Sequence, residues 1–137
     1  MKQKSEKINK HTGVIVQIQG VVVDVQFEVG FVPAIYEALT VGSEFTSSKT
    51  LVLEVEQHLG DNRVRTVALG PTDGLRRGLS VSATGAPISV PVGKKTLGRI
   101  FNVVGEPIDE GAAVTGAKLH PIHRHAPTLA SQSTKRE

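Results

Sequence analysis

Residues 14–27 read VIVQIQGVVVDVQF, and this stretch sets the expected fold class. Before Gly20 the apolar residues Val14, Val16 and Ile18 stand at even positions, whereas after it the apolar face moves to odd positions. Alternation of apolar and polar residues is typical of a half-buried strand, and a change of parity at a glycine predicts a bulge or sharp bend. We therefore expect one long strand that turns a barrel corner at Gly20. The polar residues expected on its opposite face are Gln17, Gln19, Asp24 and Gln26.

A second strand pattern occupies residues 51–69. Leu51, Leu53 and Val55 alternate with Glu54, Glu56 and His58. The sequence Gly60-Asp61-Asn62 predicts a tight reversal, so residues 51–69 are expected to form a hairpin. Further turn signals at Asp73-Gly74 and Gly78 precede a strand that begins at Leu79. Many short strands at regular spacing predict a mainly β fold, with a small closed β-barrel over residues 12–84.

The stretch from residue 85 onward predicts a different unit. Four apolar residues recur with helical spacing, and they are Leu97, Ile100, Phe101 and Val104. Thr96 can cap this expected helix, Gly105 suits its end and Pro107 stops it. From Asp109 onward no period is sustained, which predicts a loop. We interpret residues 85–137 as a unit distinct from the barrel.

Composition excludes several classes of protein. The 137 residues include no cysteine, so disulfides and thiolate metal sites are excluded, and no apolar run is long enough to span a membrane. The net charge of +3 falls within residues 1–10, which also lack the apolar stretch of a secretory signal. We expect residues 1–11 to form a disordered basic leader and the folded body to be neutral, which argues against nucleic-acid binding.

Two motifs invite assignment as a ligand site, and neither supports it. Gly93-Lys94-Lys95-Thr96 lacks the glycine five positions earlier, and the Ser or Thr directly after the first lysine, that a phosphate-binding loop requires. The histidines His120, His123 and His125 surround Pro121, which blocks a helix, and no cysteine accompanies them. We therefore expect a solvated loop rather than a zinc site.

Two charged pairs also predict no chemistry. The adjacent acids Asp109 and Glu110 are expected to be exposed, and no base or nucleophile is near them in the sequence. Arg76 and Arg77 lie between glycines and suit an exposed turn, although a phosphate or subunit contact is also compatible with them. The residues alone therefore assign no catalytic, cofactor-binding or metal-binding side chain.

Six segments in order resemble the β-subunit family of F-type ATP synthases. They are Val22–Phe27, Leu53–Asn62, Thr72–Gly78, Thr84–Gly93, Leu97–Asp109 and Pro121–Lys135. Gln57–Gly60 and Phe101–Pro107 are similar to the β rather than the related α subunit. Val21 departs from the family, which usually has proline there, and His125 also differs.

The resemblance implies a role in ATP synthesis or hydrolysis coupled to proton transport. It also implies that residues 85–137 are the truncated beginning of an α/β nucleotide-binding domain. In that family the N-terminal barrels of alternating α and β subunits form a crown, and the hexamer surrounds a γ stalk. The complex is peripheral to the cytoplasmic face of the bacterial cell membrane. The family's ATP, ADP and Mg²⁺ sites lie beyond Glu137, so we expect this chain to bind none of these ligands and to be inactive alone.

Two alternatives remain open from the sequence. Small closed barrels often bind single-stranded nucleic acid, although this chain has five aromatic residues and a neutral body. A factor that caps incomplete rings through barrel contacts is the other alternative.

Overall fold

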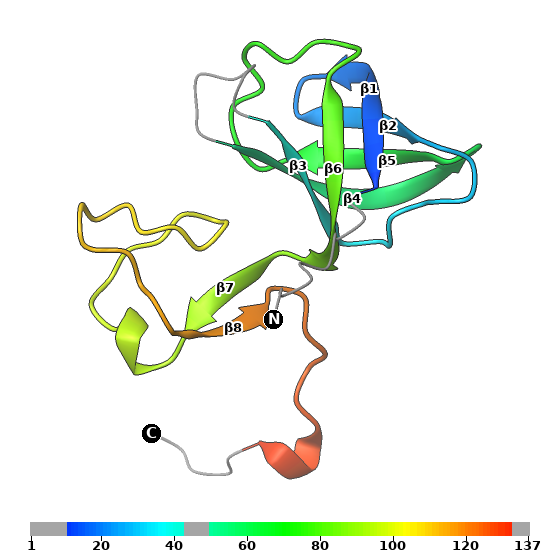
Figure 1. Cartoon of the computed structure of the whole chain (residues 1–137). Coiled ribbons are helices and arrows are strands. Elements are labelled where there is room, and N and C mark those ends of the chain that lie inside the picture. The colour runs from blue at the N-terminus through cyan, green and yellow to red at the C-terminus, as the bar shows by residue number, and fades with distance from the viewer. Residues whose placement is uncertain (1–10, 43–49, 133–137) are drawn as a thin grey trace, which may run out of the picture.

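The structure is a computed structural model that describes residues 11–42 and 50–132. Except for His11, the expected leader lies outside the described residues. The described chain forms a closed antiparallel barrel, in the order β1-β2-β5-β4-β3-β6, and a separate two-stranded sheet (Figure 1). The barrel strands are β1 (Thr12–Gln19), β2 (Val22–Phe27), β3 (Glu37–Val41), β4 (Leu51–Gly60), β5 (Arg63–Ala68) and β6 (Ser80–Pro87). The mainly β fold and the closed barrel are thus confirmed.

The bend expected at Gly20 is wrong. Gly20, at φ +60°, and Val21 form the two-residue turn of a hairpin, in which Gln19 pairs with Val22. The register shift lies earlier in β1, between Ile15 and Gln17. Before this shift Ile15 is buried in the core while Val14 is 42% exposed, contrary to the parity, whereas after it Ile18 packs against the core, as the parity predicted.

The hairpin expected over residues 51–69 is confirmed. Asp61 and Asn62 both have positive φ, at 51° and 57°, as a type I′ turn between two twisted strands requires. Leu51, Leu53 and Val55 of β4 point into the barrel and are at most 1% exposed, whereas Leu59 near the end of the strand is 37% exposed. The core that fills the barrel is aliphatic apart from one ring, and consists of Ile15, Val23, Val25, Phe27, Leu39, Val41, Leu51, Leu53, Val55, Val64, Ala68, Leu79, Val81 and Ala83.

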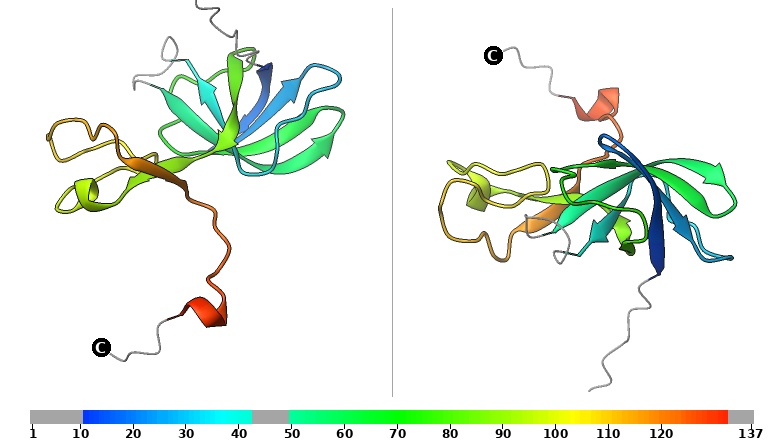
Figure 2. Two further views of the ribbon diagram at one scale, coloured as in Figure 1. Left: turned by 60° about the horizontal axis from the view of Figure 1, so that its bottom comes forward. Right: turned by 90° about the horizontal axis from the view of Figure 1, so that it is seen from above.

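Beyond the barrel lies a segment that we call the extension (residues 88–132). It contains β7 (Ser89–Val92), which pairs antiparallel with β8 (Lys118–Pro121), and two 3-10 helices, η2 (Lys94–Thr96) and η3 (Leu129–Ser131). Both views in Figure 2 place the β7–β8 sheet beside the barrel and not within it. The loop expected from Asp109 onward therefore contains a strand that the sequence did not reveal. Among the described helices, none has the length and apolar character needed to cross a membrane.

The α-helix expected from Leu97 to Val104 is wrong. Gly98 has φ +71°, which is outside the helical region, and the stripe is not covered along its length: Leu97 and Ile100 are 76% and 61% exposed, while Phe101 and Val104 are half-buried. Asn102 instead organises a turn, because its side-chain oxygen accepts hydrogen bonds from the backbone N–H groups of Val104 (3.1 Å) and Glu106 (2.8 Å). Such side-chain bonds compete with the helix for the same backbone donors.

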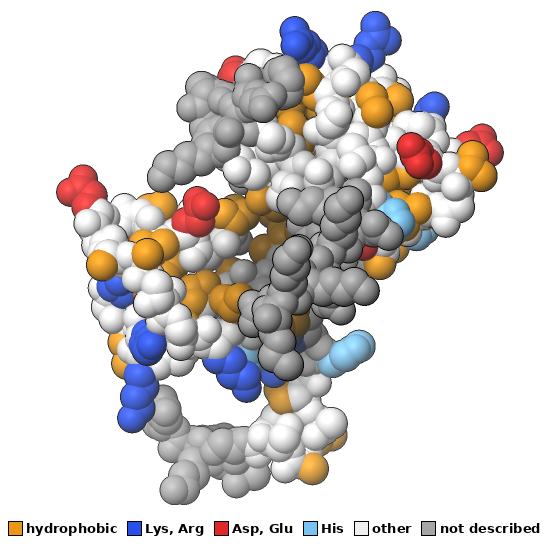
Figure 3. All heavy atoms as spheres, in the orientation of Figure 1, with side chains coloured by type: hydrophobic (Ala, Val, Ile, Leu, Met, Phe, Trp, Pro, Cys, Tyr) orange, Lys and Arg blue, Asp and Glu red, His pale blue; other side chains and the backbone are white. Residues whose placement is uncertain are grey.

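This turn packs closely on the sheet. Gly105 has φ +81°, and a Cβ built there would lie 2.8 Å from the ring of Pro91 in β7. Glycine at this position therefore permits both the turn and its approach to the strand. Figure 3 shows hydrophobic side chains on the surface of the extension; those exposed by 60% or more are Leu97, Ile100, Val103, Ile108, Leu119 and Leu129.

Candidate functional site at the junction of barrel and extension

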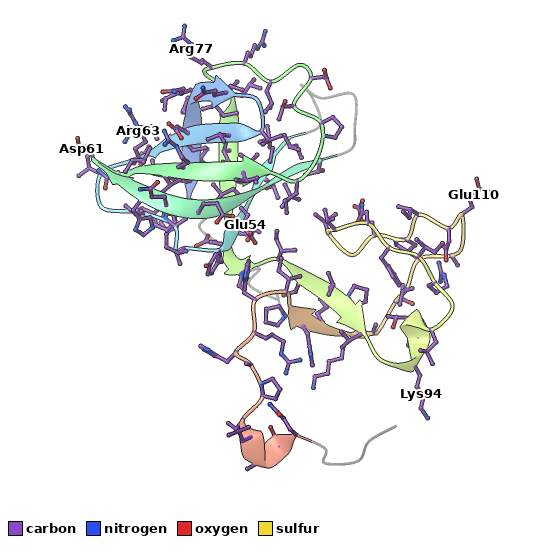
Figure 4. All side chains as sticks on the ribbon, turned by 180° about the vertical axis from the view of Figure 1, so that it is seen from behind. Glu54, Asp61, Arg63, Arg77, Lys94 and Glu110 are labelled. Carbon is purple, nitrogen blue, oxygen red and sulfur yellow. The ribbon has the colours of Figure 1, made fainter. Side chains whose placement is uncertain are left out.

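The glycine–lysine motif, which does not meet the requirements of a phosphate-binding loop, makes hydrogen bonds within the chain. Gly93 precedes η2, and Lys95 Nζ donates to the backbone oxygen of Thr115 at 2.9 Å. Arg77 is exposed at the end of the barrel away from the extension (Figure 4). Within residues 11–42 and 50–132, no group of three or more His, Cys, Asp or Glu residues could hold a metal ion.

Asp109 is not the exposed acid that we expected. It is half-buried and accepts two hydrogen bonds from the Arg99 guanidinium, at 2.5 and 2.9 Å. The bond with Arg99 holds the pKa of Asp109 well below its usual range, and backbone N–H donors at Gly111 and Ile100 lower it further. Glu110 is exposed, as expected. This ion pair closes the base of the turn around Asn102.

Three carboxylates are buried in the described part of the chain, although the sequence pattern placed two of them on polar faces. Asp24 is 3% exposed and receives two hydrogen bonds of 2.9 Å from Arg65 on the neighbouring strand. Glu37 and Glu54 are each 7% exposed and lie at the side of the barrel that faces the extension. Figure 4 shows Glu54 at this side. Buried charges need partners, so the contacts of these two acids identify the site.

Glu54 is paired with a histidine from the extension. His123 Nε2 lies 2.9 Å from Glu54 Oε2, across 69 residues of sequence. The imidazole also stacks on the ring of Tyr36, with the ring centres 3.9 Å apart and the planes at 18°. His123 lies in an exposed loop, as expected, but its contacts with Glu54 and Tyr36 were not predicted; His120 contacts Arg124 at 3.2 Å.

Tyr36 is held in an unusual backbone conformation. Its φ is +68°, a value that residues other than glycine rarely adopt. The backbone N–H of Tyr36 donates to the carbonyl of Val55 at 2.7 Å, and this bond fixes the residue against β4. The conformation places its ring where His123 stacks.

A second acid stands beside this pair. Burial raises the pKa of Glu56, and a hydrogen bond and like charge from Glu54 raise it further, whereas positive charge on His123 lowers it. The three ionisable groups therefore influence one another. We call Tyr36, Glu54, Glu56 and His123 the junction cluster.

A largely apolar pocket of about 200 Å³ adjoins the junction cluster. It lies between residues 34–37 and residues 85–87, and His123 completes its lining. Glu37 connects the two walls, because its carboxylate accepts hydrogen bonds from the backbone N–H groups of Ala34 (3.0 Å) and Gly85 (2.8 Å). The buried acid thus shapes the place where the chain leaves the barrel.

Comparison with known families decides what the barrel is. A family model described as the β-barrel domain of the ATP synthase alpha/beta family matches residues 15–85. This match spans just over half of the chain and lies within strands β1 to β6. The chain belongs to the ATP synthase alpha/beta family.

Membership of the ATP synthase alpha/beta family implies that the chain works in a complex with other subunits. The match covers the barrel and does not distinguish an α from a β subunit. The junction cluster joins this family barrel to the extension, since His123 lies outside the matched residues while its partners lie within them.

Proposed function

We propose that the chain is the N-terminal part of the catalytic β subunit of an F-type ATP synthase. In this proposal its barrel joins those of α subunits in the crown of the hexamer, around the γ stalk. The whole subunit then makes or hydrolyses ATP coupled to proton transport, as a peripheral part of the complex at the cytoplasmic face of the bacterial membrane. The observation that carries the proposal is the family match over a complete barrel.

The β assignment is supported by two segments of the sequence. Gln57–Gly60 forms the end of β4, and Phe101–Pro107 contains the turn organised by Asn102. Both resemble the β rather than the α subunits of the family.

The closed barrel favours a particular kind of subunit contact. Every barrel strand pairs with two others, because β6 pairs with both β1 and β3 and closes the sheet. Neighbouring barrels are therefore expected to meet through side chains rather than by joining strand edges.

We propose that the described residues hold neither ATP nor Mg²⁺. Lys95, in the glycine–lysine sequence that most resembles a phosphate loop, is hydrogen-bonded to the backbone of residues 115 and 116. We therefore assign nucleotide chemistry to no residue of this chain and limit its proposed role to assembly.

Binding to isolated subunits tests the proposal. The chain would be mixed with purified α or β subunits of a bacterial F-type ATP synthase and examined by size-exclusion chromatography and native mass spectrometry. We expect complexes with α and none with β. A Leu53→Asp variant would place a charge in the barrel core and disrupt it, so it is the control that shows whether binding needs a folded barrel. Binding to β alone would make the chain α-like, and binding to neither would reject the assembly role.

The aromatic contacts give no support to the nucleic-acid alternative. Phe31 stacks on His11 and packs edge-on against Phe27, and Tyr36 stacks on His123. A platform for bases needs free ring faces, and these rings are engaged within the chain. Phe45 lies outside the described residues.

A further inference from the structure

The junction cluster joins three parts of the chain that are distant in sequence. Tyr36 precedes β3, Glu54 and Glu56 lie on β4, and His123 follows β8. His123 binds the barrel through a charged partner and a ring at once, at 2.9 Å from Glu54 and 3.9 Å from the centre of the Tyr36 ring. The side chain of Glu54 is 9% exposed, whereas that of His123 is 39% exposed. Water can therefore exchange protons with the imidazole while its partner stays buried.

Acidic side chains surround the His123 imidazole. Glu54 and Glu56 face it from β4, and Glu37 on β3 lines the same pocket. The neighbouring cation, Arg124, contacts His120. β4 also carries His58, whose Nε2 lies 2.7 Å from the carbonyl oxygen of Pro33. The immediate surroundings of the imidazole are thus acidic.

We propose that protonation of His123 fastens the stretch after β8 to the barrel, and that loss of this proton releases the stretch and opens the pocket beside Tyr36. A protonated imidazole donates a charge-assisted hydrogen bond to Glu54, which is about twice as strong as a neutral one. The same cation is attracted to the face of the Tyr36 ring. A neutral imidazole can still donate Nε2–H to the carboxylate and stack on the ring, but it has lost its positive charge, so both attractions become weaker.

The expected pH range follows from the ordinary behaviour of the groups. Histidine is the side chain whose charge ordinarily changes between about pH 5 and 8, so a change in the contact is expected within this interval. Ionisation of Glu56, whose pKa is raised by burial and by Glu54, adds negative charge beside the imidazole. This device belongs to the chain itself and does not depend on whether the chain is an α or a β subunit.

Tyr36 reports directly on the contact. It is the single tyrosine of the chain, which has no tryptophan, so the intrinsic fluorescence of the full chain comes from the ring that His123 covers. We expect emission to rise between pH 5.5 and pH 8 as the imidazole leaves. Amide exchange at residues 122–126, corrected for the intrinsic effect of pH, should become about fivefold faster over the same interval.

Matched variants separate this mechanism from a general effect of pH. His123→Gln removes the titrating group while keeping a hydrogen-bond donor, so both transitions should be lost. Glu54→Gln should weaken them, whereas His125→Gln, at an exposed neighbouring position, should leave them unchanged. Far-UV circular dichroism establishes that each variant keeps its barrel. A fluorescence transition that persists in His123→Gln, or exchange at residues 122–126 that is equal at the two pH values, would overturn the proposal.

Discussion

Glu37 is expected to stabilise the barrel through its two backbone contacts. Its carboxylate is buried and accepts hydrogen bonds from the N–H groups of Ala34 and Gly85. Ala34 is 3 residues from Glu37 in the sequence, whereas Gly85 is 48 residues away. Hydrogen bonds to a charged group contribute about 1.5–3 kcal/mol each. Two effects make the loss smaller than the sum of these bonds. Both amides belong to exposed residues, so water can replace the carboxylate, and removal of the acid also removes the cost of burying its charge. We therefore expect Glu37→Ala to lower the free energy of unfolding by about 2 kcal/mol, which is less than the sum of two such bonds.

Urea unfolding at pH 7, followed by circular dichroism, measures this loss. A change of about 2 kcal/mol corresponds to a fall in Tm of roughly 10 °C for a domain of this size. Glu37→Gln keeps one acceptor oxygen and should lose less, whereas Glu28→Gln, at an exposed position, should be neutral. A Glu37→Ala variant within about 0.5 kcal/mol of the unsubstituted chain would refute the reasoning, because ordinary surface substitutions have effects of that size.

Three further substitutions test other contacts. Gly13→Ala should lower the free energy of unfolding in urea by about 2 kcal/mol, because the new Cβ would lie 2.8 Å from Val25 Cγ1 and 2.9 Å from a backbone oxygen; an unchanged value would contradict the packing. Glu56→Gln should raise the Tm at pH 7 but not at pH 4, since a raised pKa means that ionisation opposes folding once the pH exceeds the unfolded value; equal shifts at both pH values would contradict this. Because the pKa of Asp109 is lowered, its ionised carboxylate contributes to stability above its unfolded pKa, and this contribution is lost only as the pH falls through the folded pKa. Amide protection in the turn around Asn102, followed by nuclear magnetic resonance, should therefore persist at pH 4 in the unsubstituted chain and be lost in Asp109→Asn at pH 7.

The barrel was predictable because its signals are local. The hairpin of β4 and β5 combines strict alternation with an Asp61-Asn62 turn, and both cues act over a few residues. β1 was misread because the register shift near Ile15 exchanges inward and outward positions within one strand. Alternation cannot reveal such a shift, since the pairing partner decides where it falls.

The helix at Leu97 failed for a related reason. Its apolar spacing was correct as a pattern, but an amphipathic helix is stabilised chiefly by the surface that covers it. Here Leu97 and Ile100 of the stripe stay exposed, while Gly98 and Asn102 favour turns. Local competition therefore decides the conformation.

The junction cluster could not be predicted from the sequence. Glu54 stands at a polar position of an alternating strand, which predicts exposure, and nothing near His123 marks it as its partner. The two meet because β7 and β8 return the chain to the barrel, and this path is a property of the whole fold. The one local trace of the site is the positive φ of Tyr36, which no sequence rule assigns to a tyrosine.

The barrel and the extension also differ in what stabilises them. Each barrel strand is hydrogen-bonded on both sides and encloses a continuous apolar core. The extension has two paired strands, and Ile88 at its start is the one hydrophobic residue in its described part that is buried. Its conformation therefore depends on polar contacts, such as Arg99 with Asp109 and His123 with Glu54. Because ion pairs respond to pH and salt while a packed core does not, the path of the chain beyond the barrel is the part of this structure that solution conditions can change.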